Sequence, residues 1–366
     1  MSAVMIDKVT SPHLYVALSP HGYGHAAMTA PVLNTLRAHI PYLRLTIETN
    51  VPRHWLVERV TGSFEYIPTR DFGMVMRSAT EVDAERSHAA YLDLHADWPA
   101  TVAKEAEQLQ ITQPDIVLSN ISHLALAAAA RAHVPAVALC SLNWAGIYRA
   151  YCGDRPGADR VLAQMEAAYS TARVFLRSLP AMRMPCVFHV QDIGPIARQG
   201  CNRRQELRHL LGVTEKIRIG LLAFGGIAPA LILEKWPRHP GWLWIAGLSQ
   251  VPARSDIVKA ETLPLPFIDL LASAEVVLTK PGYGTFTEAA CARVAVLHSC
   301  REGWPEAVPL SQWLQAHTRA LTVPAERLRV GDFAAELEAV LALPQPTPPP
   351  QQTGIDQAVE AIVRLL

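Results

Sequence analysis

The chain has 366 residues, half of them apolar and 18% charged, which is the composition of a globular protein too long for one ordinary hydrophobic core. Its 33 Lys and Arg residues equal its 33 Asp and Glu residues, so the excess of positive charge typical of general nucleic-acid binding is absent. Its six cysteines include no CxxC pair, which argues against a disulfide framework or a cysteine zinc site and favours a reducing cytoplasm.

Nothing in the hydropathy pattern predicts a membrane segment. Residues 1–10 lack the apolar core of a signal peptide. The most apolar region, residues 124–140, is interrupted by Arg131, His133 and Pro135 and cannot span a bilayer. We therefore expect a cytoplasmic protein without a membrane span, and peripheral membrane contact stays open.

The first half of the chain alternates predicted strands and helices. Residues 14–18 are an apolar run bounded by turn residues, typical of a buried parallel strand. Further strands are expected at 43–49, 64–68, 115–119 and 136–140, and helices at 26–38, 52–60, 80–110 and 125–132. This alternation predicts a parallel, doubly wound α/β sheet.

The second half repeats the pattern after a break. Proline and glycine crowd residues 180–205, and we place a hinge near Gln199. Strands are expected at 217–223, 242–246, 275–278 and 294–298, and a helix at 202–211. We predict three parts: residues 1–198, residues 199–345, and residues 346–366, a proline-rich tether with an amphipathic helix that packs back on the first part.

Glycine turns between a strand and a helix occur at residues 22–24, 225–226 and 282–284. Such turns let the backbone approach a ligand, and the helix N-terminus then faces an anion. Glu288 lies one helical turn after Gly284, where a carboxylate can accept hydrogen bonds from ribose hydroxyls. The pattern predicts a nucleotide site in a cleft between two Rossmann-like domains. The alternative is a tight turn with Glu288 as a solvated acid.

The order of these motifs resembles that of GT-B glycosyltransferases. Most closely it resembles the glycosyltransferase-like N-terminal domain of L-arabinokinase-type proteins and their free-standing bacterial relatives. The matching segments are residues 21–25, 118–120, 141–148, 224–226, 280–288 and 301–306. The resemblance implies an α/β GT-B fold, with two Rossmann-like doubly wound parallel-sheet domains facing a cleft.

The same resemblance implies a nucleotide-sugar donor, a UDP-sugar, whose sugar passes to an unknown acceptor hydroxyl with inversion. Residues 1–198 would form the acceptor domain and residues 199–345 the nucleotide-sugar domain. The implied donor-binding residues are Gly225, Gly226, Lys280, Gly282, Gly284, Thr285, Glu288 and Glu306. Lys280 is equally compatible with a solvated surface cation, and Glu302 is an alternative to Glu306. No DxD-like carboxylate pair follows a predicted strand, so we expect neither a metal site nor a cofactor.

Catalysis would fall to His25 or, alternatively, His21, because an imidazole can take the proton of the attacking hydroxyl. The alternative is that His25 has only a structural role and caps its helix. The two histidines have an i, i+4 spacing, but the glycines between them and the lack of a third ligand argue against zinc. Close relatives often carry an acid where Asn120 stands, and another at Ala145. Asn120 can orient the histidine only weakly.

Asn143 and Trp144 are expected on the acceptor side, with interdomain core as the alternative for Trp144. The expected partners are the donor and a small-molecule or lipid-linked acceptor, not nucleic acid.

Two other functions stay open. One is a non-catalytic nucleotide-sugar-binding module. The other is a sugar-nucleotide epimerase or hydrolase, whose candidate acids are Glu48, Asp71 and Asp83.

Overall fold

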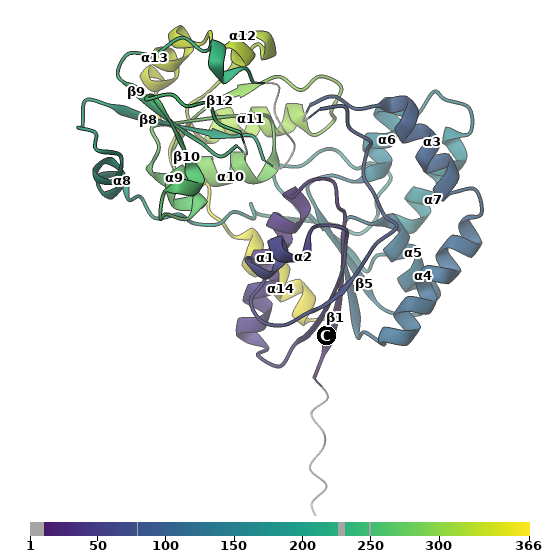
Figure 1. Cartoon of the computed structure of the whole chain (residues 1–366). Helices are drawn as coiled ribbons and strands as arrows, with labels where there is room; N and C mark the ends of the chain where they lie inside the picture. Colours follow the sequence, from purple (N-terminus) through teal and green to yellow (C-terminus); the bar gives the residue numbers. More distant parts are fainter. Residues whose placement is uncertain (1–10, 79, 226–230, 249) are drawn as a thin grey trace, which may run out of the picture.

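The computed structural model describes residues 11–78, 80–225, 231–248 and 250–366. These residues form two lobes, each built on one parallel β-sheet covered by helices (Figure 1). The predicted α/β fold with two Rossmann-like sheets is therefore confirmed. Among the described helices, none has both the length and the apolarity that crossing a bilayer requires.

The first sheet has seven strands in the order β3-β2-β1-β4-β5-β6-β7, all parallel. The strands are β1 (His13–Leu18), β2 (Arg44–Glu48), β3 (Glu65–Ile67), β4 (Ile116–Asn120), β5 (Ala136–Cys140), β6 (Val174–Ser178) and β7 (Val190–Ile193). The helices of this half are α1 (Gly24–His39), α2 (Arg53–Val57), α3 (Ala84–Leu94), α4 (Trp98–Thr112), α5 (His123–Arg131), α6 (Trp144–Cys152) and α7 (Ala158–Tyr169). Strands β1, β4 and β5 are buried along their whole length, as apolar strands at the centre of a covered sheet must be.

The second sheet has six parallel strands in the order β10-β9-β8-β11-β12-β13. The strands are β8 (Arg218–Ala223), β9 (Trp242–Ala246), β10 (Ile257–Lys259), β11 (Val276–Thr279), β12 (Ala295–Ser299) and β13 (Ala320–Val323). The helices are α8 (Arg204–Leu211), α9 (Phe267–Ser273), α10 (Tyr283–Cys291), α11 (Ala307–His317), α12 (Ala325–Val330), α13 (Ala334–Ala342) and α14 (Gly354–Val363), with short 3-10 turns at Leu233–Lys235 and Ala260–Thr262.

The helix expected at 80–110 is wrong as a single element, because two helices, α3 and α4, occupy the region. The side chain of Asp97 accepts a hydrogen bond from the Ala100 amide at 3.2 Å and so caps a new helix. The expected alternation also missed β6, β7, β10 and β13. Strands β7 and β13 are edge strands with half-exposed positions, and they lack the continuous apolar run that marks a central strand.

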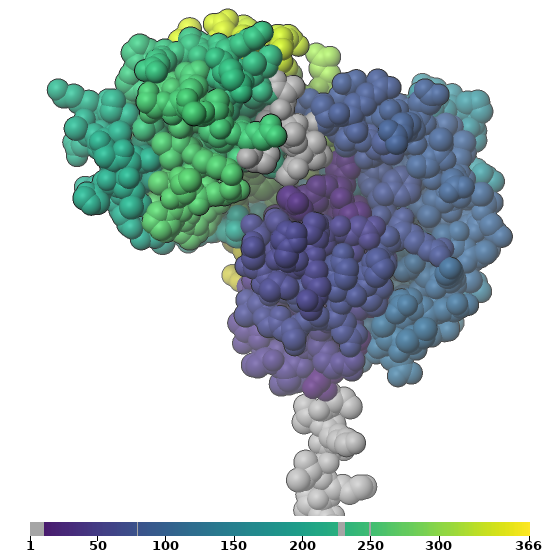
Figure 2. Space-filling model, viewed as in Figure 1, coloured from purple at the N-terminus to yellow at the C-terminus, as the bar shows by residue number. Residues whose placement is uncertain are grey.

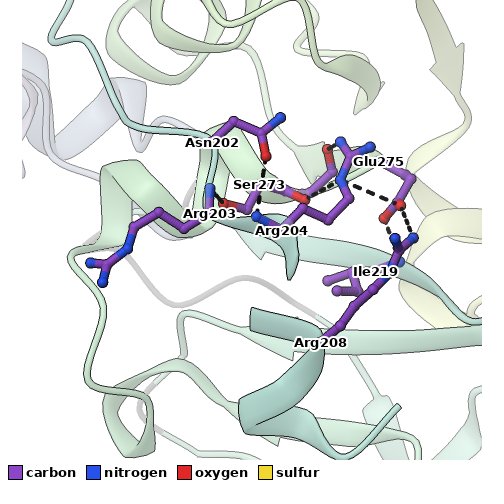
Figure 3. A network of polar contacts seen from close by, with 8 residues as sticks. Asn202, Arg203, Arg204, Arg208, Ile219, Ser273 and Glu275 are labelled. Carbon is purple, nitrogen blue, oxygen red and sulfur yellow. Dashed lines mark hydrogen bonds and ion pairs between the residues drawn. The ribbon is translucent and has the colours of Figure 1, made fainter. Parts of the chain in front are cut away.

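A polar network fastens the start of the second half to its sheet (Figure 3). The Arg204 Nε atom on α8 donates to the Ser273 carbonyl at 2.8 Å. The carboxylate of Glu275 accepts from Arg208 Nη2 at 2.9 Å and from the Ile219 amide at 2.6 Å. These bonds join α8 to the first residues of β8 and to the end of α9.

The C-terminal helix α14 returns to the first lobe, where it packs beside α1 and next to β7 (Figure 1). The Gly194 amide donates to Gln357 Oε1 at 2.7 Å. A Cβ atom added to Gly354 would lie 2.1 Å from the Gly194 carbonyl oxygen, so this close crossing requires glycine. The division of the chain at residues 198 and 345 stays a prediction.

Candidate active site

The two lobes appear as separate masses in Figure 2, and residues that follow strands of the two sheets are in contact where the lobes meet. Ser141, which follows β5, donates its hydroxyl to Glu306 Oε1 at 2.5 Å, although the two residues belong to different sheets. Tyr151 on α6 donates its hydroxyl to the Glu302 carbonyl at 3.3 Å. The loops that follow β5 and β12 therefore meet between the lobes, and His21, in the loop after β1, stacks on Trp304 in the loop after β12.

His25 lies in the first turn of α1 and is almost completely buried. Its Nδ1 atom is 2.9 Å from Asn120 Oδ1, and the Asn120 amide nitrogen donates to Thr29 Oγ1 at 2.8 Å. Because the amide nitrogen is used on Thr29, the amide oxygen accepts a proton carried on His25 Nδ1. Burial lowers the pKa of His25 and outweighs the hydrogen bond to Asn120, which raises it. The ring is thus neutral at neutral pH, with a free lone pair on Nε2.

His21 is held between two tryptophans. Its ring lies edge-on to Trp144 at 5.0 Å and stacks on Trp304 at 5.9 Å. Burial lowers the pKa of His21 to about 3, with smaller contributions from the charges of His25, Arg301 and Lys280. A base with so low a pKa is weak, which counts against His21 as the general base.

The two residues expected on the acceptor side are buried. Trp144 has no exposed surface and donates its Nε1 proton to Ser19 Oγ at 3.0 Å. Asn143 is also buried, and its side chain caps α6 by accepting from the Gly146 amide at 2.7 Å. Both sets of contacts are structural, and acceptor binding by this pair stays a prediction.

The third glycine turn opens α10. Gly282 is the residue before the helix, and the first backbone bond runs from the Phe286 amide to the Gly282 carbonyl at 3.1 Å. The amides of Gly284 and Thr285 therefore precede the first intrahelical bond and are available to an anion. Gly225 has φ 76°, a conformation that favours glycine. Gly226 lies outside the described residues.

Lys280 and Glu306 give the cleft its buried charges. Burial lowers the pKa of Lys280 to about 8, with Arg301 adding to the shift and Glu306 opposing it. Glu306 immediately precedes α11 and accepts from Ser141 and from Trp304 Nε1, the latter at 3.3 Å. Burial raises the pKa of Glu306, and these hydrogen bonds and the two nearby cations counteract part of that rise.

Glu288 is not a free solvated acid. Its Oε1 atom accepts from Arg198 Nε at 2.9 Å, and its side chain is only 12% exposed. Burial raises the pKa of Glu288, and Arg198 opposes the rise. This ion pair ties the segment between the two sheets to the middle of α10, and it leaves Oε2 without a partner in the hydrogen bonds of the described residues.

Comparison with known proteins agrees with this architecture. No family model matches the sequence. The chain is 26% identical over 352 residues to the L-arabinokinase of Arabidopsis thaliana, an alignment that covers 91% of this chain and 33% of that protein. The chain thus spans about a third of that relative. The similarity supports the resemblance derived from the motifs.

Solved structures show the same fold. A UDP-glucosyltransferase from Polygonum tinctorium that glucosylates indoxyl has a TM-score of 0.60 at 12% identity, covering 97% of this chain and 98% of its own. The chain has the GT-B fold. A Listeria monocytogenes protein assigned as a UDP-N-acetylglucosamine 2-epimerase has a TM-score of 0.56 at 11% identity, covering 96% of each chain.

In this GT-B fold two of the three candidate acids of an epimerase or hydrolase are engaged within the first lobe, whereas the third, Asp71, has no hydrogen-bond partner among the described residues for either carboxylate oxygen. Asp83 caps α3, and Glu48 accepts from Tyr15 and Thr69 at 3.1 and 2.5 Å. Asp71 is buried, and burial raises its pKa to about 7. Among the described residues, no group of three His, Cys, Asp or Glu side chains is arranged to hold a metal ion.

The sequence motifs did not identify three residues of the GT-B cleft as functional candidates, namely Ser141, Arg198 and Arg301. Ser141 and Arg198 each contact a residue far away in the sequence, and the surroundings of Arg301 depend on the folded structure. Neither feature can be read from the spacing of residues in the sequence. Ser141 and Glu306 are 165 residues apart, and Arg198 and Glu288 are 90 apart. Only the docking of the two sheets could have identified these pairs.

Proposed function

We propose that this chain is a glycosyltransferase that moves a sugar from a nucleotide-sugar donor, with UDP as the nucleotide, to an acceptor hydroxyl. We further propose inversion at the anomeric carbon and no requirement for a metal ion. One observation carries the proposal. The first turn of α1 holds a neutral imidazole, α1 contacts α10, and α10 begins three residues after Lys280 at the end of β11.

His25 would act as the general base. The acceptor oxygen attacks the anomeric carbon while its proton passes to His25 Nε2, and the bond from that carbon to the diphosphate oxygen breaks. Asn120 holds the proton on Nδ1 and thereby keeps Nε2 as the acceptor. Asn120 is thus a positioning residue in this scheme.

Groups of the second lobe would hold the donor. The amides of Gly284 and Thr285, with Gly225 opposite them and Lys280 beside them, can neutralise the leaving diphosphate. Glu288 would accept hydrogen bonds from the ribose through its Oε2 atom. Glu306 would contact hydroxyls of the donor sugar, on the side where Ser141 joins it to the first lobe.

Calorimetric titration of the purified protein with UDP, GDP and dTDP, with and without EDTA, tests the donor site. Micromolar UDP binding that is indifferent to EDTA supports the proposal and identifies the nucleotide. Substitution Glu288→Ala should then weaken UDP binding, whereas His25→Ala should abolish transfer and leave UDP binding nearly intact. Absence of binding by any nucleotide would overturn the proposal.

A non-catalytic nucleotide-sugar-binding module is the second candidate, and Asn120 is the observation that favours it. An amide gives the imidazolium formed during transfer no charge stabilisation, unlike the carboxylate of a catalytic triad. A protein that binds a UDP-sugar tightly, yet neither transfers nor hydrolyses the sugar over a panel of acceptors, would support this candidate. Conversion between UDP-sugar epimers would instead support the epimerase activity that the GT-B fold also hosts.

A further inference from the structure

Arg301 is a half-buried cation at the edge of the cleft that the proposed mechanism does not use. It lies in the loop between β12 and α11, and its guanidinium carbon is 3.6 Å from the ring centroid of Trp304. Across the described part of the chain, Arg301 forms no ion pair, and its buried Nε atom has no hydrogen-bond partner. Burial lowers its pKa to about 10, so the side chain stays charged at neutral pH. A guanidinium without a paired carboxylate is available to an anionic ligand.

The charges around Arg301 do not balance. Arg301 lowers the pKa of Lys280, and both cations lower the pKa of His21, whereas Glu306 raises the pKa of Lys280 and of Arg301. His21 is neutral because of its low pKa. The donor diphosphate would engage Lys280 and the N-terminus of α10. Glu306 would then be the carboxylate near Arg301, although no ion pair joins these two side chains in the described part of the chain.

The position of Arg301 indicates which part of a donor it would meet. It precedes Glu306, the residue proposed to contact sugar hydroxyls, by five positions in the same loop. Arg301 and Trp304 line a cavity of about 530 Å³, together with Ser311 and Gln312 on α11. The guanidinium of Arg301 therefore lies beside the proposed sugar position, next to polar side chains suited to hydroxyl groups.

We propose that the donor sugar carries a carboxylate, as in a nucleotide-linked uronic acid, and that Arg301 pairs with that carboxylate. The inference rests on the proposed function. A guanidinium can donate two parallel N–H hydrogen bonds to one carboxylate. Trp304 holds the guanidinium plane in place, and Trp304 is itself fixed by stacking on His21 and by its bond to Glu306. Arg301 is thus assigned as a residue that determines donor specificity.

Calorimetry with matched donor pairs tests this assignment. The wild-type protein is titrated with UDP, with UDP-glucose and UDP-glucuronate, and with UDP-galactose and UDP-galacturonate. We expect one uronate to bind roughly tenfold or more tightly than its neutral counterpart. Arg301→Gln should remove that preference and leave UDP affinity within about twofold, and Arg301→Lys should retain part of it. The control is Arg173→Gln, which changes an exposed arginine just before β6, at the amino end of that strand and away from the loops of the cleft, and it should change nothing.

The outcomes separate this inference from the proposed function. Wild-type protein that binds UDP but binds uronates no better than neutral UDP-sugars would overturn the inference and leave the transferase proposal intact. Equal weakening of UDP and of every UDP-sugar by Arg301→Gln would assign Arg301 to the diphosphate and also overturn it. Failure of UDP itself to bind the wild-type protein would count against the proposed function.

Discussion

His25 Nδ1 lies 2.9 Å from Asn120 Oδ1, and this hydrogen bond fixes the tautomer of the imidazole. The Asn120 nitrogen is committed to Thr29, so its oxygen cannot turn away from His25 without losing a second bond. An amide in this place orients the ring but adds no negative charge near it. Burial therefore dominates the pKa of His25 and holds it below the usual value.

Asn120→Asp should raise the pKa of His25, because a carboxylate stabilises the protonated ring that burial disfavours. We expect a rise of about one unit or more. A general base works only when deprotonated, so the acidic limb of the pH profile of kcat/KM should move to higher pH, while the rate on the plateau increases. Proton NMR titration of the His25 ring, assigned by comparison with His25→Ala, measures the shift without an assay. Thr29→Val is the uncharged control, and an Asn120→Asp pKa at or below that of the wild type would contradict the argument.

Lys280 should make nucleotide binding sensitive to alkaline pH. Its pKa in the free protein is lowered to about 8 by burial, so it binds a diphosphate as a cation below that pH and loses its charge above it. UDP affinity should therefore fall as the pH rises from about 7.5 to 9.5, by up to roughly tenfold per unit well above the pKa. Calorimetry at a series of pH values measures this dependence.

The matched variant for this prediction is Lys280→Arg, since a guanidinium stays protonated over the same range. It should bind UDP with little change between pH 7.5 and 9.5. Lys280→Met should bind weakly at every pH. A wild-type affinity that stays flat across the range would show that Lys280 does not contact the diphosphate.

The parts of the site that the sequence predicted are those built by local patterns. Apolar strands followed by glycine turns placed His25 and Gly284 at the ends of β1 and β11, and the structure confirms those elements. The sequence could also have predicted that Asn143 caps α6, because an asparagine is a common N-cap when it precedes a helix and a free amide lies three residues later. The pairs Ser141–Glu306 and Arg198–Glu288 could not be predicted in this way, since they depend on how the two sheets dock.

Arg198 should control how strongly acid weakens UDP binding. Burial raises the pKa of Glu288, and Arg198 limits that rise. The ribose would be held by the carboxylate form, so affinity is present above the pKa of Glu288 and is lost as the pH falls through it. Arg198→Gln should raise that pKa and move the loss of affinity to higher pH. Calorimetric UDP titrations from pH 5 to 8 check this, and an unchanged acid dependence in the variant would exclude Glu288 as the titrating group.

The Glu275 network should matter more for stability than a neighbouring exposed ion pair. Glu275 is 14% exposed and joins Arg208 to the Ile219 amide, so Glu275→Ala leaves a half-buried cation and an amide without partners. We expect a loss of about 2–4 kcal/mol in the free energy of unfolding of the second lobe. Glu206 is the matched control, because its side chain is 46% exposed where it pairs with Arg203. Glu206→Ala should lower the free energy of unfolding by less than about 1 kcal/mol. Urea unfolding followed by tryptophan fluorescence measures both, since Trp242 and Trp244 lie on β9 of that lobe. Equal midpoints for the two variants would show that the network around Glu275 adds no more than a surface ion pair does.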